Sequence, residues 1–252
     1  AKRHGRGVQI WGPDSPWAGN RYQGDYRNGT ENGHGVYIWA NGDRYAGEWK
    51  DGLHHGRGVY SWGPGSPWAG DRYQGQYKDD KKHGRGVYAW ADGSRYEGEY
   101  RDGAKHGRGV LVWVNGDRYA GDWQNDRAHG KGVWIGANGA RYEGDFKAGK
   151  YNGYGVFRQA NGNKYQGSFS NGRAEGHGVY SFANGDRYIG SFKAGKWHGR
   201  GTFSYRGGEQ CDGNWQGTML LGTGDALVDG QSTRCFMDGG KLTFEIEEGT
   251  QN

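Results

Sequence analysis

A five-residue motif recurs along this chain at a fixed interval. It has the form Tyr-x-Gly-x-aromatic, and one copy is Tyr45-Ala46-Gly47-Glu48-Trp49. From position 73 the copies begin at 73, 96, 119, 142, 165, 188 and 211, every 23 residues, and positions 22 and 45 are also 23 residues apart. Only the step from 45 to 73 is longer, at 28 residues. A fixed period of this length indicates a repeat architecture in which each repeat contacts its neighbours.

Each repeat has a second half of the form Gly-x-Gly-Val-aromatic, as in Gly56-Arg57-Gly58-Val59-Tyr60. In both halves, aromatic residues and glycines alternate with charged or small residues, which is the period of a β-strand with two different faces. Asn-Gly and Asp-Gly pairs, such as Asn41-Gly42, separate the strands and are typical of tight hairpin turns. We therefore expect an all-β fold: a single-layer, curved antiparallel meander of tandem β-hairpin repeats that forms an elongated trough.

The composition favours a thin structure. Hydrophobic residues make up 33% of the chain, while 54 of 252 residues are glycine, 12 are Trp and 18 are Tyr. This leaves few aliphatic side chains for a thick core. Because a glycine leaves a vacant patch on the sheet, we expect tyrosine and tryptophan rings to lie over the glycines and to pack on one another.

Two segments depart from the rhythm and define the expected domain organisation. Residues 12–20 and 63–71 are enlarged loops that hold all four prolines, within a repeat array expected over residues 1–224. After it, residues 225–252 are expected to form capping strands, the last of them over residues 242–247. The carboxylates of that strand would discourage edge-to-edge pairing, and the opening half-repeat leaves self-association at the other edge as an expectation.

The Tyr-x-Gly-x-Trp motif followed by His-Gly-x-Gly, on this period, resembles the MORN repeat (membrane occupation and recognition nexus). The resemblance covers residues 4 to about 224. It implies a curved sheet of consecutive hairpins. It also implies a scaffold or adaptor role, since some members bind peptides along the groove and phospholipid binding is attributed to others.

We expect a non-enzymatic scaffold that binds a segment of a partner protein along the aromatic-lined concave groove. Aromatic rings and exposed main chain suit an extended peptide. The candidate groove residues are Tyr60, Trp62, Tyr96, Trp113 and Trp123.

The two enlarged loops each carry a tryptophan, Trp17 and Trp68, in a Ser-Pro-Trp sequence. They are expected on the same long edge of the sheet, two repeats apart. One interpretation makes them recognition loops for a partner or ligand. The other has each Trp fold back over the aromatic face or the sheet edge. An aromatic pocket near these loops, for a small molecule or for a product-shaping enzyme, is a further alternative.

The basic residue before each tyrosine forms a row that includes Arg44, Arg72, Arg95 and Arg118. Acidic residues such as Glu48 follow four positions later, so cross-strand ion pairing on a solvated face is the plain interpretation. Binding of anionic phospholipid is the alternative, as a peripheral membrane module. The net charge of +5 is mild for this length, and no nucleic-acid partner is expected.

No catalytic residues, cofactor or metal are expected. The aligned histidines, such as His55 and His83, would lie about 10 Å apart in successive repeats, too far to share a metal, and are interpreted as turn-stabilising residues. Same-face carboxylates such as Glu97 and Glu99 resemble a glycosidase pair only in spacing. No phosphate loop, dinucleotide fingerprint or Gly-x-Ser-x-Gly sequence occurs.

Cys211 and Cys235 lie at nearly equivalent positions in consecutive repeats. Regular hairpin spacing would hold them about 10 Å apart, so two free thiols are expected unless the last repeat is distorted. Free thiols favour a reducing compartment. With no apolar run long enough to span a bilayer, we expect a cytoplasmic protein. Association with a membrane or the cytoskeleton stays open, and so does export, because the numbering starts at Ala1 instead of Met.

Overall fold

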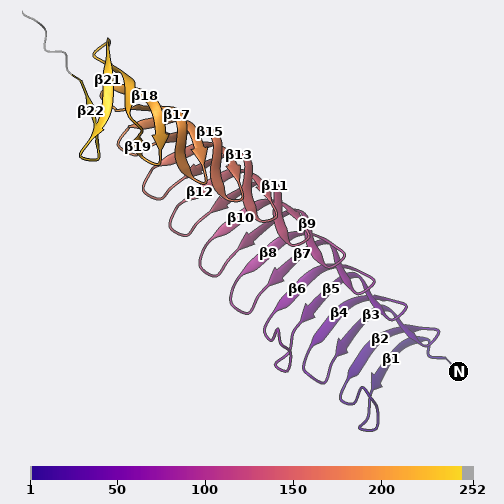
Figure 1. The fold of residues 1–252 in the computed structure, drawn as a ribbon. Helices are drawn as coiled ribbons and strands as arrows, with labels where there is room; N and C mark the ends of the chain where they lie inside the picture. Colours follow the sequence, from indigo (N-terminus) through magenta and orange to yellow (C-terminus); the bar gives the residue numbers. More distant parts are fainter. Residues whose placement is uncertain (1, 246–252) are drawn as a thin grey trace, which may run out of the picture. The chain divides into compact units, whose positions relative to one another are not determined.

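The structure, a computed structural model, describes residues 2–245, and these contain strands and turns but no helix (Figure 1). The strands are β1 Gly5–Ile10, β2 Arg21–Arg27, β3 Thr30–Ile38, β4 Arg44–Lys50, β5 Leu53–Ser61, β6 Arg72–Lys78, β7 Lys81–Ala89, β8 Arg95–Arg101, β9 Ala104–Val112, β10 Arg118–Gln124, β11 Arg127–Ile135, β12 Arg141–Lys147, β13 Lys150–Arg158, β14 Lys164–Ser170, β15 Arg173–Ser181, β16 Arg187–Lys193, β17 Lys196–Ser204, β18 Gln210–Gln216, β19 Met219–Leu220, β20 Thr223–Val228, β21 Gln231–Asp238 and β22 Lys241–Phe244.

The chain forms two compact units, Ala1–Ala128 and His129–Asn252. In the first unit each strand from β1 to β10 pairs antiparallel with the next one in sequence. In the second unit the same order runs from β11 to β18. The expected all-β antiparallel meander is therefore confirmed within each unit.

The second unit ends in a different arrangement. Strand β18 pairs with the short β19 and also with β20, and β20, β21 and β22 continue as hairpins. The expected last strand over residues 242–247 is present as β22, which ends at Phe244; residues 246 and 247 lie outside the described residues.

The tight turns lie within the repeats. Asp51 and Gly52, which join β4 to β5, both have positive φ, of 51° and 82°, as a two-residue hairpin loop requires. The assignment of this chemistry to Asn41-Gly42 was wrong, because only Gly42 of that pair has positive φ. That link spans Trp39 to Asp43 and is closed by a hydrogen bond from the Trp39 amide to the Asp43 carbonyl, at 2.9 Å.

A β-bulge near the start of each second strand was not foreseen. Gly47 pairs with Gly58, but the next residue, Glu48, pairs with His55, so Gly56 and Arg57 are extra on β5. Gly56 adopts φ +57°, a conformation that favours glycine. Because the bulge adds two residues, alternation is kept, and His54 lies opposite Trp49 on the face that also carries Tyr45.

The tyrosine that opens each motif covers a pair of glycines, as expected. Tyr96 is fully buried, and a Cβ built on Gly98 or on Gly109 of the facing strand would collide with its ring or hydroxyl group. The hydroxyl donates a hydrogen bond to the Glu99 carbonyl at 3.0 Å. The same hydroxyl-to-carbonyl bond forms at positions 22, 45, 73, 119, 142, 165 and 188.

The second aromatic of each motif links neighbouring repeats. Tyr77 packs edge-on against Tyr73 of its own strand, with ring centroids 5.2 Å apart, and against Tyr45 of the preceding repeat, at 5.3 Å. Tyr100 and Trp123 repeat this pair of contacts one and two repeats later. The edge-to-face geometry is the favourable one for aromatic pairs, so each repeat is stabilised by its neighbour.

The two cysteines form a disulfide, and the expectation of free thiols was wrong. Cys211 on β18 and Cys235 on β21 have Cα atoms 6.0 Å apart, and both are fully buried. Strand β20 lies between them in the pairing order, but it places Gly224 opposite Cys235. Since Gly224 has no side chain, the two sulfur atoms can meet over it.

We expect Gly109→Ala to lower the free energy of unfolding by about 2 kcal/mol, because its methyl group would displace the buried Tyr96 ring. Gly12→Ala is the matched control, since nothing lies within 4 Å of its Cβ position. Chemical denaturation of both variants measures the difference. Equal stability of the two variants would contradict the role given to the tyrosine–glycine packing.

Reduction of the disulfide should destabilise the end of the second unit. A crosslink over 24 residues contributes roughly 3 kcal/mol by restricting the unfolded chain. The melting temperature of the wild-type protein should fall when a thiol reductant is added, whereas a Cys211→Ala, Cys235→Ala double variant should melt at one temperature in both buffers. If the wild-type protein melted at the same temperature with and without the reductant, the crosslink would not stabilise the fold.

Candidate functional site

In the first unit, seven aromatic residues form a continuous row above the buried tyrosines. We call it the aromatic row: Trp11, Tyr37, Trp39, Tyr60, Trp62, Tyr88 and Trp90. Successive ring centroids are 5.4, 4.5, 5.3, 4.6, 5.3 and 4.6 Å apart along this order. Tyr88 is buried and the others are half-buried. The row therefore presents ring surface to solvent along consecutive repeats.

Buried polar side chains fix the tyrosines of the row. Asp43 accepts hydrogen bonds from the Tyr60 hydroxyl at 3.0 Å and from the Gly63 amide at 2.7 Å. Asp71 does the same for the Tyr88 hydroxyl and the Ala91 amide. Each of these carboxylates thus joins the ring and the loop of the following repeat, which leaves the row little freedom to rearrange.

The electrostatics keep these hydroxyl groups protonated. Burial raises the pKa of Tyr60 and of Tyr88, and the hydrogen bond to the neighbouring carboxylate, Asp43 or Asp71, raises it further. Both hydroxyls therefore serve as hydrogen-bond donors at any physiological pH.

Basic side chains lie beside the row, two residues before the first glycine of the bulge. His54, Lys82 and Lys105 each pair, across the hairpin, with the second aromatic of the motif, which is Trp49, Tyr77 or Tyr100. Being on the aromatic face, these three residues contact rings instead of the charged side chains of the other face. We call them the basic positions.

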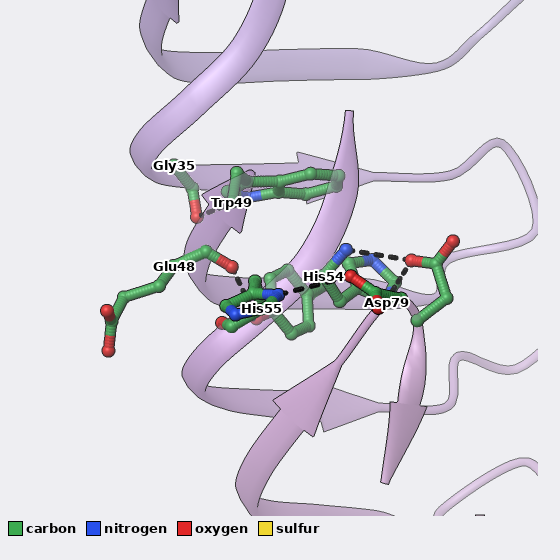
Figure 2. A network of polar contacts seen from close by, with 8 residues as sticks. Gly35, Glu48, Trp49, His54, His55 and Asp79 are labelled. Carbon is green, nitrogen blue, oxygen red and sulfur yellow. Dashed lines mark hydrogen bonds and ion pairs between the residues drawn. The ribbon is translucent and has the colours of Figure 1, made fainter. Parts of the chain in front are cut away.

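His54 stacks on Tyr45 with ring centroids 3.8 Å apart, and its Nδ1 lies 3.2 Å from a carboxylate oxygen of Asp80. Burial lowers the pKa of His54 to about 4, and the Asp80 charge opposes the shift without cancelling it. We therefore treat the imidazole as neutral, and the hydrogen bond between the two residues is the one that the His54 backbone amide donates to the Asp80 carboxylate, at 2.8 Å. The Trp49 indole nitrogen, drawn beside His54 in Figure 2, donates to the Gly35 carbonyl at 3.3 Å.

The two lysines make cation–π contacts. The Lys82 ammonium lies 4.5 Å from the centre of the Tyr88 ring, and the Lys105 ammonium lies 5.3 Å from Trp90 and 5.1 Å from Trp123. Burial lowers the pKa of both lysines. Among residues 2–245, no carboxylate lies within 4.0 Å of either ammonium group. The aromatic rings are thus their main partners.

The second unit fills the same position with uncharged residues. Tyr151 stacks on Tyr142 at 3.7 Å, Trp197 stacks on Tyr188 at 4.0 Å, and Ala174 occupies the repeat between them. The combination of an aromatic row with basic positions is therefore a property of the first unit.

The predicted groove residues divide into two layers. Tyr60, Trp62 and Trp113 are half-buried and accessible on the aromatic face. Tyr96 and Trp123 have exposed fractions of 0% and 6%, so their expected placement on the groove surface needs correction. They cover the paired glycines and form the layer beneath that surface, because the motif tyrosine and its second aromatic are the packing residues of the repeat.

The two enlarged loops have the same internal structure. In the first, the Ser15 amide donates to the Gly12 carbonyl and the Trp17 amide to the Ser15 hydroxyl; the second repeats both bonds with the residues at positions 63, 66 and 68. Trp17 and Trp68 have exposed fractions of 60% and 59%. The interpretation in which each Trp folds back as a cover is therefore wrong.

The charged rows pair differently from the expectation. Arg95 binds Glu97 at 2.7 Å, two residues along its own strand, and Arg72 binds Gln74 in the same way. The acidic residues four positions along bind bulge amides, as when Glu48 accepts from the Arg57 amide at 2.8 Å. Cross-strand ion pairs also form, between Asp145 and Lys131 at 2.6 Å and between Asp122 and Arg108 at 3.8 Å. Arg44 and Arg118 also lie on this polar face of the sheet, and anion binding by the row stays a prediction.

The histidines of the His-Gly-x-Gly motif lie at the bulges, on the polar face. The Nδ1 of His55 approaches Asp79 at 3.4 Å without the geometry of a hydrogen bond (Figure 2). Over residues 2–245, no group of three or more His, Cys, Asp or Glu side chains gathers where it could hold a metal ion. The two carboxylates of the predicted glycosidase-like spacing have other partners: Glu97 forms an ion pair with Arg95, and Glu99 accepts a hydrogen bond from the Arg108 amide. Within the same range no helix is long and apolar enough to cross a bilayer.

The basic positions lie on the face that simple alternation gives them, because residue 54 shares its face with Gly56, Gly58 and Tyr60. They were missed because only the aromatic residues of that face were considered as candidates. The bulge was missed as well, and its signal was Gly56. Because Gly58 already accommodates the tyrosine ring, the preceding glycine indicates a special backbone conformation.

Acid should destabilise the first unit through His54. A histidine whose pKa falls from 6.5 unfolded to about 4 folded contributes stability that is fully present above pH 6.5. That contribution is lost as the pH falls toward 4, up to about 3 kcal/mol. We expect His54→Tyr, which copies Tyr151, to remove this part of the pH dependence in denaturation series from pH 7 to pH 4. His55→Asn, which copies Asn152, should keep it; identical pH slopes for the two variants would contradict the assignment.

A family model matches most of this chain. The model of the MORN repeat family matches residues 2–14, 22–44, 45–66, 73–95, 96–118, 119–141, 142–164, 165–187 and 188–210. No curated protein matches the sequence. Among solved structures, a mutant TCP10 domain of Danio rerio CPAP is similar with 12% identity and a TM-score of 0.43, over 85% of this chain and 96% of that one. The Drosophila melanogaster SAS-4 TCP domain, in complex with a proline-rich motif of Ana2, has 15% identity and a TM-score of 0.38, over 60% and 83%. On the evidence of the nine matched repeats, the chain belongs to the MORN repeat family.

Proposed function

We propose that this MORN protein is a non-enzymatic scaffold that binds an extended segment of a partner protein along the aromatic face of its first unit. The observation that carries the proposal is the aromatic row, in which half-buried rings follow one another through consecutive repeats. Partly exposed Trp and Tyr side chains in a contiguous patch are typical of protein interfaces.

The rigidity of the row supports the same proposal. Its tyrosines are held by Asp43 and Asp71, so a bound segment would meet rings that are already ordered. A preorganised surface loses less conformational entropy on binding than a mobile one.

The loops that carry Trp17 and Trp68 are candidates for a second contact with the partner. Both rings are mostly exposed, and both loops are fixed by the same hydrogen bonds. Rigid loops with an exposed tryptophan suit the anchor residues of an interface. These loops could also contact a small ligand or the headgroups of an anionic membrane, and vesicle sedimentation with and without Trp68→Ala separates these alternatives.

The proposal is tested with a photo-crosslinking amino acid placed in the full chain. We expect the crosslinker at position 62, on the aromatic row, to capture a discrete protein partner in cells. The crosslinker at Ser61, the neighbouring residue on the opposite face of β5, should capture none. Mass spectrometry of the adduct should locate the crosslink in one short segment of the partner. Equal capture from both faces, or capture from neither, would contradict the proposal.

A further inference from the structure

The basic positions of the first unit and the repeat spacing together indicate which kind of partner segment the aromatic face binds. Lys82 and Lys105 occupy the same place in consecutive repeats, each opposite the second aromatic of its hairpin. Equivalent places in consecutive hairpins are two strand spacings apart, about 9.6 Å. The face therefore offers positive charge at a regular interval beside a row of rings.

The two ammonium groups lack a carboxylate partner. The acids whose charges act on them also bind other groups: Asp71 accepts a hydrogen bond from the Tyr88 hydroxyl, and Asp126 accepts one from the Lys105 backbone amide. Three rings lie within 5.6 Å of each ammonium group, and both lysines are only half-buried. An incoming carboxylate would complete the coordination of each ammonium group.

The spacing selects the conformation of the ligand. A polyproline II helix has three residues per turn and rises about 3.1 Å per residue, so every third residue returns to the same side after about 9.3 Å. That matches the repeat spacing of about 9.6 Å. In a β-strand, by contrast, residues three apart point to opposite sides. Polyproline II segments also dock on aromatic surfaces, which the row provides.

We propose that the aromatic face of the first unit binds an acidic polyproline II segment of a partner protein, running along the repeats with a carboxylate at every third residue facing Lys82 and Lys105. The segment crosses the strands, and its intervening residues pack on Trp62, Tyr88 and Trp90. This inference rests on the proposed function and assigns the chemistry of its partner. It also explains why the ligand would choose the first unit, since the second unit has Tyr151, Ala174 and Trp197 at the same position.

The test uses the full chain and fluorescently labelled synthetic peptides of six Glu-Pro-Pro triplets, with binding followed by anisotropy. Three further peptides serve as comparisons: Gln-Pro-Pro triplets, Lys-Pro-Pro triplets, and a peptide of equal length and charge in which Glu occurs at irregular intervals. We expect the Glu-Pro-Pro peptide to bind at least about tenfold more tightly than the others, as expected for charge-assisted hydrogen bonds. Its affinity should fall as the salt concentration rises.

Variants then locate the site. Lys82→Met and Lys105→Met should each weaken binding of the Glu-Pro-Pro peptide about tenfold, while Lys81→Met, at the exposed neighbouring residue of β7, should leave it unchanged. Lys82→Ala, which copies Ala174, is a second version should the methionine variant fail to melt cooperatively.

The outcomes separate this inference from the proposed function. Equal binding of the Gln-Pro-Pro and Glu-Pro-Pro peptides would overturn the acidic specificity. Equal binding of the irregular peptide would overturn the spacing argument. The inference would be overturned if none of the four peptides bound. It would also be overturned if the lysine variants lost binding to phosphatidylserine vesicles but still bound the peptides as the wild type does. The proposed function falls only if the crosslinker at position 62 also captures no protein segment.

Discussion

The fold depends on the contact between one buried tyrosine and two glycines. The ring of Tyr96 occupies the space where side chains at Gly98 and Gly109 would otherwise stand, and its hydroxyl group satisfies a backbone carbonyl at the bulge. This contact brings two strands close together and covers their backbone without a second layer of structure. A single sheet can thus exclude water from its own main chain, which most sheets achieve by packing on helices or on another sheet.

The repeat, the alternation of faces and the tyrosine–glycine packing could all be predicted from the sequence, because each is a consequence of period and side-chain size. The bulge at Gly56 could not be predicted from alternation, since it depends on a positive φ at one glycine. His54, Lys82 and Lys105 were missing from the candidate site for another reason, since alternation places them on the aromatic face but they carry no motif aromatic. Tyr60, Trp62 and Trp113 are accessible aromatics whose role in binding stays a prediction, whereas Tyr96 and Trp123 are buried.

The disulfide shows a second limit of reasoning from period. Regular spacing separates Cys211 from Cys235, and it fails where the repeat decays, because the aromatic pair Tyr188–Phe203 of the preceding repeat is replaced by Cys211 and Ala226. Irregular features of this kind appear wherever the chain departs from its rhythm. The enlarged loops are another case: the sequence located them, but it could not decide whether Trp17 and Trp68 would point outward.

The contact of the second aromatic with the preceding repeat affects how such chains can change length. Because Tyr77 contacts Tyr45 in the same way that Tyr100 contacts Tyr73, any two repeats present the same junction to each other. A recombination event that inserts or deletes one whole period therefore joins surfaces that already fit. Gene duplication can lengthen the array without compensating substitutions, whereas an insertion of any other size must be absorbed in a loop, as at residues 63–71.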